Sequence, residues 1–292
     1  MFDTNEDLNE ARARNVRDAL REDIGQHDWT AELVQAEQRV AAQVLVREEA
    51  VLCGRDWFDA CVLALDPEAR IAWHVAEGAL MAANTLVCRI ESNARALLSA
   101  ERPALNFLQL LSGTATLTRR HVEAIAGASP AIGNRARRCL ILDTRKTLPG
   151  LRQAQKYAVR TGGGHNQRLA LWDGILIKEN HIAAAGGITA VLRNAQALNA
   201  GVAIQIEVES LAQLAEALAA GAASVLLDNF DLAGMREAVA LNGGRALLEV
   251  SGGVQFDQVR EIAATGVDRI SIGRLTKDVR ATDYSMRVLG AL

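Results

Sequence analysis

The stretch "AIQIEVESLAQLAEALAAGAASVLLDN", residues 203–229, contains two short apolar runs separated by a segment rich in alanine and leucine. The apolar runs, 203–209 and 224–229, predict β-strands, and the segment between them predicts a helix that ends at Gly221. Strands that are almost continuously apolar are buried on both faces, as in parallel sheets. The stretch therefore predicts one βαβ unit of a parallel sheet.

The same pattern repeats through the second half of the chain. Short apolar strands alternate with helix-like segments, and the other predicted strands are "CLILDTRK" (139–146), "GILIKEN" (174–180), "ALLEVSGG" (246–253) and "RISIG" (269–273). Six or more such units predict a (β/α) barrel, and a doubly wound sheet is the alternative.

The first 115 residues or so follow a different pattern. Helix-like segments at 9–22, 55–65 and 94–127 mix with apolar strands without strict alternation, and Pro103 is expected to interrupt the third helix or to open a second one. We therefore expect an α/β chain with an N-terminal domain at 1–115 and a barrel domain at 116–280. Residues 280–292 are expected to pack back on the first domain.

Composition excludes several classes of protein. The net charge of −3 and the pI near 6.0 argue against nucleic acid as the main partner. No run of 18 apolar residues is present, and the first 25 residues lack the apolar centre of a signal peptide. The four cysteines form no CxxC motif and are expected to be buried, reduced thiols, which favours a cytoplasmic location. Five arginines are expected to form a solvated surface cluster: Arg119, Arg120, Arg135, Arg137 and Arg138.

Each apolar strand of the second half ends in polar residues. In a parallel barrel the carboxyl ends of the strands meet at one rim, which carries the active site. The polar strand ends are Asp143-Thr144-Arg145-Lys146, Lys178-Glu179-Asn180, Glu207 with Glu209, Asp228-Asn229, Ser251-Gly252-Gly253 and Ser271-Ile272-Gly273.

Four cations would share this rim: Arg145, Lys146, Arg168 and Lys178. Two like charges ~5 Å apart at an effective dielectric constant near 20 repel by about 3 kcal/mol. Such a cluster predicts a small ligand that carries several negative charges.

The two glycine-containing strand ends, 251–253 and 271–273, predict a phosphate site, because small residues let backbone N–H groups approach an anion. Glu207 and Asp228 end neighbouring strands and could hold Mg²⁺ beside a phosphorylated ligand. They could instead pair with Lys146 or Lys178.

The chain resembles the quinolinate phosphoribosyltransferases, also called nicotinate-nucleotide pyrophosphorylases, which are type II phosphoribosyltransferases. The resemblance covers nearly the whole chain, including 19–30 and 101–116. It rests on the motifs "DTRKTLPGLR", "KYAV", "GGG", "LIKENHI", "IEVE", "LLDNF", "EVSGG" and "SIGRLTK", in this order.

The resemblance implies a fold and a reaction. The fold is an N-terminal α/β sandwich followed by an incomplete α/β barrel, in a homodimer whose subunits close each other's barrels. The reaction transfers phosphoribosyl from phosphoribosyl pyrophosphate to the ring nitrogen of quinolinate, with Mg²⁺, and yields nicotinate mononucleotide, pyrophosphate and CO₂ in NAD biosynthesis.

The resemblance also implies roles for residues. Arg145, Arg168 and Lys178 would bind the quinolinate carboxylates, with Arg102 from the partner subunit. The predicted catalytic residues are Lys146, Lys178, Glu207 and Asp228, of which Glu207 and Asp228 would face the ribose and the metal. The 5′-phosphate and adjoining groups would be bound by Thr144, Ser251, Gly252, Gly253, Ser271, Ile272, Gly273 and Lys277.

One departure from the family pattern concerns the residues after the triple glycine. Family members often have Asn-His-Arg there, whereas this chain has Asn166-Gln167-Arg168, with a histidine at 165. Gln167 can hydrogen-bond a carboxylate but carries no charge.

Three alternatives remain at this stage. A Schiff-base aldolase on a similar barrel would use Lys178 as its nucleophile. A close relative could act on another pyridine or pyrimidine acid, and a non-catalytic relative could bind a phosphometabolite without turnover.

Overall fold

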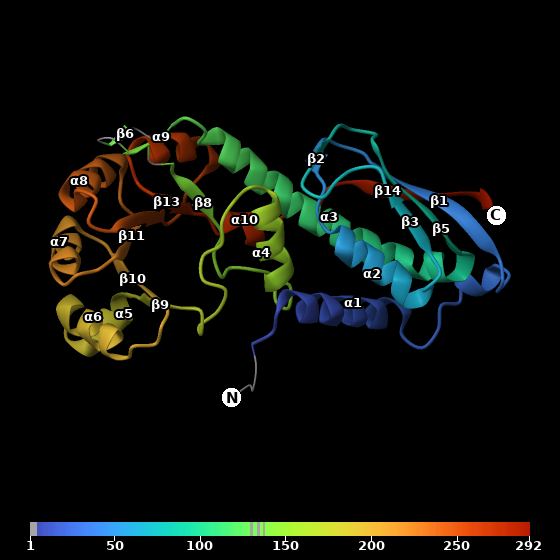
Figure 1. The fold of residues 1–292 in the computed structure, drawn as a ribbon, viewed down its shortest axis with the longest axis horizontal. Helices are drawn as coiled ribbons and strands as arrows, with labels where there is room; N and C mark the ends of the chain where they lie inside the picture. The colour runs from blue at the N-terminus through green and yellow to red at the C-terminus, as the bar shows by residue number, and fades with distance from the viewer. Residues whose placement is uncertain (1–4, 129–130, 133–134, 137) are drawn as a thin grey trace. The chain divides into compact units, whose positions relative to one another are not determined.

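A computed structural model describes residues 5–128, 131–132, 135–136 and 138–292 (Figure 1). The chain divides into two compact units. The first unit comprises Met1–Arg119, Thr147–Gly163 and Leu275–Leu292, and the second comprises Arg120–Lys146 and Gly164–Arg274. The domain limits expected from the sequence stay a prediction, and Arg137 of the predicted arginine cluster lies outside the described residues.

The first unit is built on a four-stranded antiparallel sheet in the order β14-β1-β5-β3. Every second residue of β1 is buried, including Val40, Val44 and Val46, as expected for a strand with one face on a core. Its strands are β1 (Arg39–Val46), β3 (Arg70–Trp73), β5 (Leu86–Asn93) and β14 (Tyr284–Ala291), the last of which brings the chain end back to β1. The short strands β2 (Ala50–Val51) and β4 (Leu80–Met81) pair separately.

Helices pack on this sheet through one apolar core that includes Trp57, Phe58, Leu97 and Leu108 (Figure 1). The helices are α1 (Leu8–Ile24), α2 (Arg55–Leu65), α3 (Ala94–Ala124) and α4 (Arg152–Thr161), with a 3-10 turn η1 (Ala31–Leu33). The helix α3 continues through Pro103, so the expected break at this residue is wrong. Interior proline removes a backbone donor and its ring crowds the carbonyl four residues back, so the packing of α3 on the core must offset this cost.

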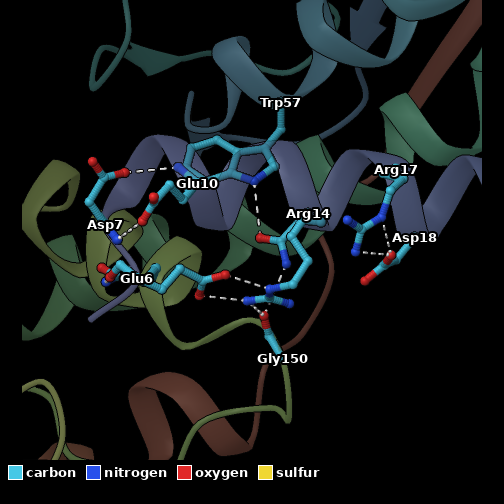
Figure 2. Close-up of polar contacts among 10 residues, drawn as sticks. Glu6, Asp7, Glu10, Arg14, Arg17, Asp18, Trp57 and Gly150 are labelled. Carbon is cyan, nitrogen blue, oxygen red and sulfur yellow. Dashed lines mark hydrogen bonds and ion pairs between the residues drawn. The ribbon is translucent and has the colours of Figure 1, made fainter. Parts of the chain in front are cut away.

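The start of α1 is fixed by side-chain hydrogen bonds (Figure 2). Asp7 accepts from the backbone N–H of Glu10 at 2.8 Å, and the Glu10 carboxylate accepts from the N–H of Asp7 at 2.9 Å. This reciprocal capping box satisfies two donors that the first turn of a helix leaves open.

The helix α1 also holds the turn at Gly150 within the first unit (Figure 2). The Arg14 guanidinium and the Asn15 Nδ2 donate to the Gly150 carbonyl at 3.1 and 3.0 Å, and Arg14 also pairs with Glu6. Asn15 is buried and accepts from Trp57 Nε1 at 3.4 Å. These contacts join α1 to the segment that precedes α4.

The second unit contains a six-stranded parallel sheet in the order β8-β13-β12-β11-β10-β9. Consecutive strands from β9 to β13 are neighbours, and β8, the first strand, pairs with β13, the last. A doubly wound sheet would instead reverse its strand order. The prediction of an incomplete barrel is confirmed, because β8 and β9 stand at the two ends of the order. The strands are β8 (Leu140–Leu142), β9 (Gly174–Ile177), β10 (Ala203–Val208), β11 (Ser224–Asp228), β12 (Leu247–Ser251) and β13 (Arg269–Ser271).

Helices connect these strands in βα order. Ser210 and Asp231 cap the N-termini of α7 and α8 through their side chains, and Gly243 ends α8 in the left-handed conformation. The connecting helices are α5 (Glu179–Ala185), α6 (Ile188–Ala197), α7 (Leu211–Ala219), α8 (Leu232–Asn242) and α9 (Val259–Ala264). The remaining elements are β6 (Ala131–Ile132), β7 (Arg135–Ala136), η2 (Phe256–Gln258) and α10 (Arg274–Lys277).

Candidate active site

A cavity of about 170 Å³ lies within the second unit at the carboxyl ends of its strands. Charged and polar side chains dominate its lining, which includes all four cations that the sequence predicts at the rim. The lining residues are Thr144, Arg145, Lys146, Gln167, Arg168, Leu176, Lys178, Glu207, Leu226, Glu249, Ser251 and Ser271. The structure therefore brings together eight of the predicted site residues in one cavity: Thr144, Arg145, Lys146, Arg168, Lys178, Glu207, Ser251 and Ser271.

The lining follows from the period of two along each strand, because alternate residues of a strand point to the same face. Lys178 follows β9 at the level of Glu207 on β10, and Glu207 lies in register with Leu226 on β11, which pairs with Glu249 on β12. These four residues form one row across the sheet, so their side chains face the same cavity.

Lys178 and Glu207 form an ion pair in this row. The Lys178 Nζ donates to Glu207 Oε2 at 3.1 Å, and the Glu207 side chain is only 11% exposed. The backbone N–H of Lys178 donates to His181 Nδ1 at 3.0 Å, which fixes the chain where α5 begins. The sequence suggested the pairing of Glu207 with a lysine as one possibility, but the role of His181 was missed.

Arg145 and Arg168 supply the two guanidinium groups of the cavity. Burial and then the neighbouring Arg145 charge lower the pKa of Arg168 below its usual value. Arg168 Nη1 donates to the Gly174 carbonyl at 2.7 Å, whereas the buried Nε of Arg145 has no hydrogen-bond partner among the described residues. A bound anion would relieve the repulsion between these two cations.

Gln167 and Glu249 of the cavity lining form a hydrogen-bonded network with the buried Gln205, and the sequence analysis missed this network. Gln167 Nε2 lies 2.7 and 2.8 Å from the two carboxyl oxygens of Glu249, and Gln205 Nε2 donates to Glu249 Oε2 at 3.0 Å. A glutamate inside the apolar strand "ALLEVSGG" was the available signal, because charged residues are rarely buried without partners.

Two glycines permit close approach of strand ends. A Cβ at Gly252, which has a φ of +100°, would lie 2.5 Å from Asn229 Oδ1 and 3.1 Å from Asp228 Oδ1. A Cβ at Gly273 would lie 3.0 Å from Lys146 Cδ. The predicted loops 251–253 and 271–273 therefore stand beside predicted site residues on other strands.

The remaining predicted residues lie outside the cavity lining. Gly252 and Gly253 line a second, open hollow of about 750 Å³ on the same unit, and Asp228 lies two residues beyond Leu226 on the same face of β11. The N–H of Ile272 donates to the Leu142 carbonyl, and its side chain is buried. Arg102 is exposed and, like Lys277, belongs to the first unit.

The triple glycine has a packing role at its first position. A Cβ at Gly162 would lie 2.4 Å from the Ala115 carbonyl oxygen of α3, so no other residue fits there without a shift of the backbone. His165 follows the triplet as an isolated parallel bridge partner of Leu142, and its side chain is exposed. The requirement for glycine at 162 therefore comes from helix packing.

The two predicted metal ligands offer chemistry that fits Mg²⁺. Glu207 and Asp228 are carboxylates on neighbouring strands, and Mg²⁺ prefers oxygen ligands. Asp228 Oδ2 accepts from Asn229 Nδ2 at 2.9 Å, which leaves acceptor capacity on the carboxylate. The described residues contain no group of three or more His, Cys, Asp or Glu side chains arranged to hold a metal ion.

Within the described part of the chain, we find no helix that is both long enough and apolar enough to span a membrane.

Two family models match the chain. The quinolinate phosphoribosyl transferase N-terminal domain matches residues 28–112, and the C-terminal domain of the same family matches residues 114–287.

Individual relatives give the same result. The chain is 38% identical to a probable nicotinate-nucleotide pyrophosphorylase [carboxylating] of Bacillus subtilis, over 91% of this chain and 90% of the relative. It is also 38% identical to the nicotinate-nucleotide pyrophosphorylase [carboxylating] of Mycobacterium leprae, over 95% and 97%. The solved structure of the nicotinate-nucleotide pyrophosphorylase from Francisella tularensis superposes with a TM-score of 0.90 at 40% identity, covering 98% of this chain and all of that one. The chain belongs to the quinolinate phosphoribosyltransferase family.

Proposed function

We propose that this chain transfers the phosphoribosyl group of phosphoribosyl pyrophosphate to the ring nitrogen of quinolinate, with loss of CO₂, to give nicotinate mononucleotide and pyrophosphate. The observation that carries the proposal is the single cavity in which Arg145, Arg168, Lys146 and Lys178 gather, in a chain of this family. The reaction is a pentosyl transfer and supplies a pyridine nucleotide for NAD biosynthesis.

The two arginines suit the pyridine substrate. Quinolinate carries two carboxylates on adjacent ring carbons, and guanidinium groups bind carboxylates through paired hydrogen bonds. Burial first, and then repulsion from the Arg145 charge, lowers the pKa of Arg168. A dicarboxylate between them would replace this repulsion by attraction, so the two guanidinium groups favour this class of ligand.

The strand ends beside the two arginines suit the phosphoribosyl donor. Lys146 would supply positive charge, and the loops 251–253 and 271–273 would bring backbone N–H groups other than that of Ile272 to the phosphates. Glu207 and Asp228 would hold Mg²⁺ together with oxygens of the donor, and the ion would neutralise charge on the pyrophosphate.

The bonds exchanged define what the residues must do. The nitrogen lone pair forms a bond to the anomeric carbon while the bond from that carbon to pyrophosphate breaks, with its electrons going to the pyrophosphate oxygen. The anomeric carbon gains positive charge in this step, and the Glu207 carboxylate would stabilise it. The carbon bearing the 2-carboxylate then loses CO₂, keeps the electron pair beside the cationic nitrogen, and takes up a proton.

Positioning contributes most of what a protein can add here. Holding the ring nitrogen against the anomeric carbon can supply roughly 7–11 kcal/mol of a barrier, because the reaction becomes effectively unimolecular. The arginines would fix the ring through its carboxylates and the phosphate loops would fix the sugar, so both reactants would be held in place for the new bond.

The proposal includes a homodimer in which Arg102 of one subunit enters the site of its partner. Arg102 is exposed on α3, as a residue that binds a partner's substrate must be. Mixed dimers of Arg102→Ala and Lys178→Ala subunits should regain about one working site per dimer, and activity that stays absent would argue against a shared site. We place the reaction in the cytoplasm, in keeping with four free, buried cysteines.

The test is a direct assay. Purified protein with Mg²⁺, phosphoribosyl pyrophosphate and quinolinate should release nicotinate mononucleotide and CO₂ in equal amounts. Nicotinate in place of quinolinate should give no comparable turnover, because it lacks the second carboxylate. Turnover of nicotinate alone, or a product that retains the 2-carboxylate, would contradict the proposal.

A second experiment addresses the aldolase alternative. Lys178 Nζ is engaged with Glu207, and the family assignment favours phosphoribosyl transfer. Borohydride in the presence of carbonyl compounds should leave Lys178 unmodified, and a reduced adduct on this residue would revive the Schiff-base hypothesis.

A further inference from the structure

The strand β12 carries a carboxyl group into the wall of the candidate active site. Glu249 lines the cavity, yet the residue is 0% exposed. Neither the ion pair of Lys178 nor the phosphate loops involve it. A buried carboxyl group without compensation costs free energy, so the structure must provide partners for it.

Amide groups provide these partners. Gln167 Nε2 lies 2.7 Å from Oε1 and 2.8 Å from Oε2 of Glu249, and Gln205 Nε2 lies 3.0 Å from Oε2. Gln167 Nε2 is also 2.9 Å from Gln205 Oε1. Both oxygens of Glu249 therefore act as acceptors, and no lysine, arginine or histidine in the described ranges forms an ion pair with it.

The amide of Gln167 has a defined orientation because its two ends bind different groups. Its Nε2 faces Glu249, and its Oε1 accepts the backbone N–H of Arg168 at 2.9 Å. The backbone N–H of Gln167 in turn donates to the buried Asp143 at 2.9 Å. A chain of hydrogen bonds thus runs from β12 through Gln167 to the backbone of Arg168.

We propose that Glu249 is a positioning residue for substrate binding, which fixes the amide of Gln167 and through it the backbone of Arg168. The inference rests on the proposed function, in which Arg168 binds a carboxylate of quinolinate. Arg168 is held at both ends in this arrangement, since its Nη1 donates to the Gly174 carbonyl. The guanidinium then needs little reorganisation when a dicarboxylate arrives.

The substitution Glu249→Gln breaks this arrangement with little change in volume. The new amide nitrogen would face the amide nitrogens of Gln167 and Gln205, so Gln167 would have to turn its own amide over. A turned Gln167 presents Nε2 to the Arg168 N–H and loses that hydrogen bond. The expected cost falls on the step in which Arg168 binds substrate.

The experiment is a double-mutant cycle of Glu249→Gln and Gln167→Ala, with the Michaelis constants for quinolinate and for phosphoribosyl pyrophosphate measured separately. Glu249→Gln should raise the quinolinate KM about tenfold and change the KM of the donor less than about twofold. In the Gln167→Ala background the same substitution should add less than about twofold, because the link is already cut.

The control is Glu216→Gln in the same unit. Glu216 is exposed, and its Oε1 accepts from the N–H and Oγ1 of Thr189 at 3.1 and 3.0 Å, so the same exchange is made on a hydrogen-bonded carboxyl group outside the cavity. This variant should keep both KM values.

Three results would overturn the inference: an unchanged quinolinate KM in Glu249→Gln, an equal rise in both KM values, or a full effect that persists in the Gln167→Ala background. If Glu249→Gln fails to fold, Gln167→Ala alone must raise the quinolinate KM selectively for the inference to survive. A wild-type protein that makes no nicotinate mononucleotide would instead refute the proposed function itself, so the two failures are distinguishable.

Discussion

In β1 of the first unit and in β10 of the second unit, successive side chains point to opposite faces of the sheet. The two strands differ in which residues occupy the face that is turned inward. The buried face of β1 consists of Val40, Ala42, Val44 and Val46, and it serves the apolar core. The cavity face of β10 carries Gln205 and Glu207, while Ile206 and Val208 are buried on the other face. A sheet that serves only as a core is apolar where it is buried, whereas a sheet that builds a site tolerates buried polar groups provided that each finds a partner.

The largest effect should come from removing a cation of the cavity. Arg145→Ala should lower kcat/KM for quinolinate by about 10³-fold, because a preorganised donor to the substrate is lost. Steady-state kinetics checks this, with Arg193→Ala on the exposed part of α6 as the control that should retain activity. If Arg145→Ala had the kinetics of the wild type, the sheet of the second unit could no longer be distinguished from that of the first as the sheet that builds a site.

A core residue of the first unit should show the opposite behaviour. Leu108→Ala empties part of a fully buried site and should lower the free energy of unfolding by about 2–5 kcal/mol. Urea unfolding measures this loss, and Leu198→Ala, at a residue 69% exposed, should change stability by no more than about 0.5 kcal/mol. At temperatures where Leu108→Ala is folded, its KM values should match the wild type.

An intermediate effect is expected from the ion pair of the cavity. Glu207→Gln keeps an acceptor for Lys178 but removes the negative charge beside the anomeric carbon. We expect kcat to fall about 10²-fold while the quinolinate KM changes little, since the charge matters mainly in the transition state. A rise in KM without a fall in kcat would show that Glu207 serves only to bind substrate.

The smallest effect concerns a carboxyl group of the first unit. Burial raises the pKa of Asp59 to about 6, although Trp73 Nε1 donates to it and opposes the shift. A raised folded-state pKa means that the stability contribution is full below the unfolded-state pKa of Asp, about 4, and is lost as pH rises through about 6.

The measurement for Asp59 is the difference in melting temperature between the wild type and Asp59→Asn. The wild type should lose stability relative to the variant as pH rises from about 4 to about 7, because only the wild type has a buried carboxyl group at position 59 that ionises over this range. A difference in melting temperature that stays constant over this range would contradict the raised pKa of Asp59.

The sequence predicts much of the second unit because its signals are local. Strand ends such as Asp143–Lys146 and Lys178 can be recognised in the sequence by a change from apolar to polar residues. Parallel pairing brings these strand ends to one rim. The barrel of parallel strands was predicted correctly for this reason, whereas its incompleteness and the family were predicted correctly from the resemblance of the motifs.

The residues that escaped prediction depend on pairing across the sheet. Glu249 and Gln205 lie two strands apart, and nothing in either strand alone shows that Gln167, from a loop between β8 and β9, completes their hydrogen bonds. The continuity of α3 through Pro103 was not predicted for a similar reason. The helix is held by tertiary packing of its apolar face, which outweighs the local effect of a helix-breaking residue.

The most direct test of the central claim is a crystal structure of the protein with bound quinolinate. The account predicts one quinolinate in the cavity of the second unit, with the guanidinium groups of Arg145 and Arg168 within hydrogen-bond distance of its carboxylates. Quinolinate bound elsewhere, with both arginines directed away from it, would contradict the account.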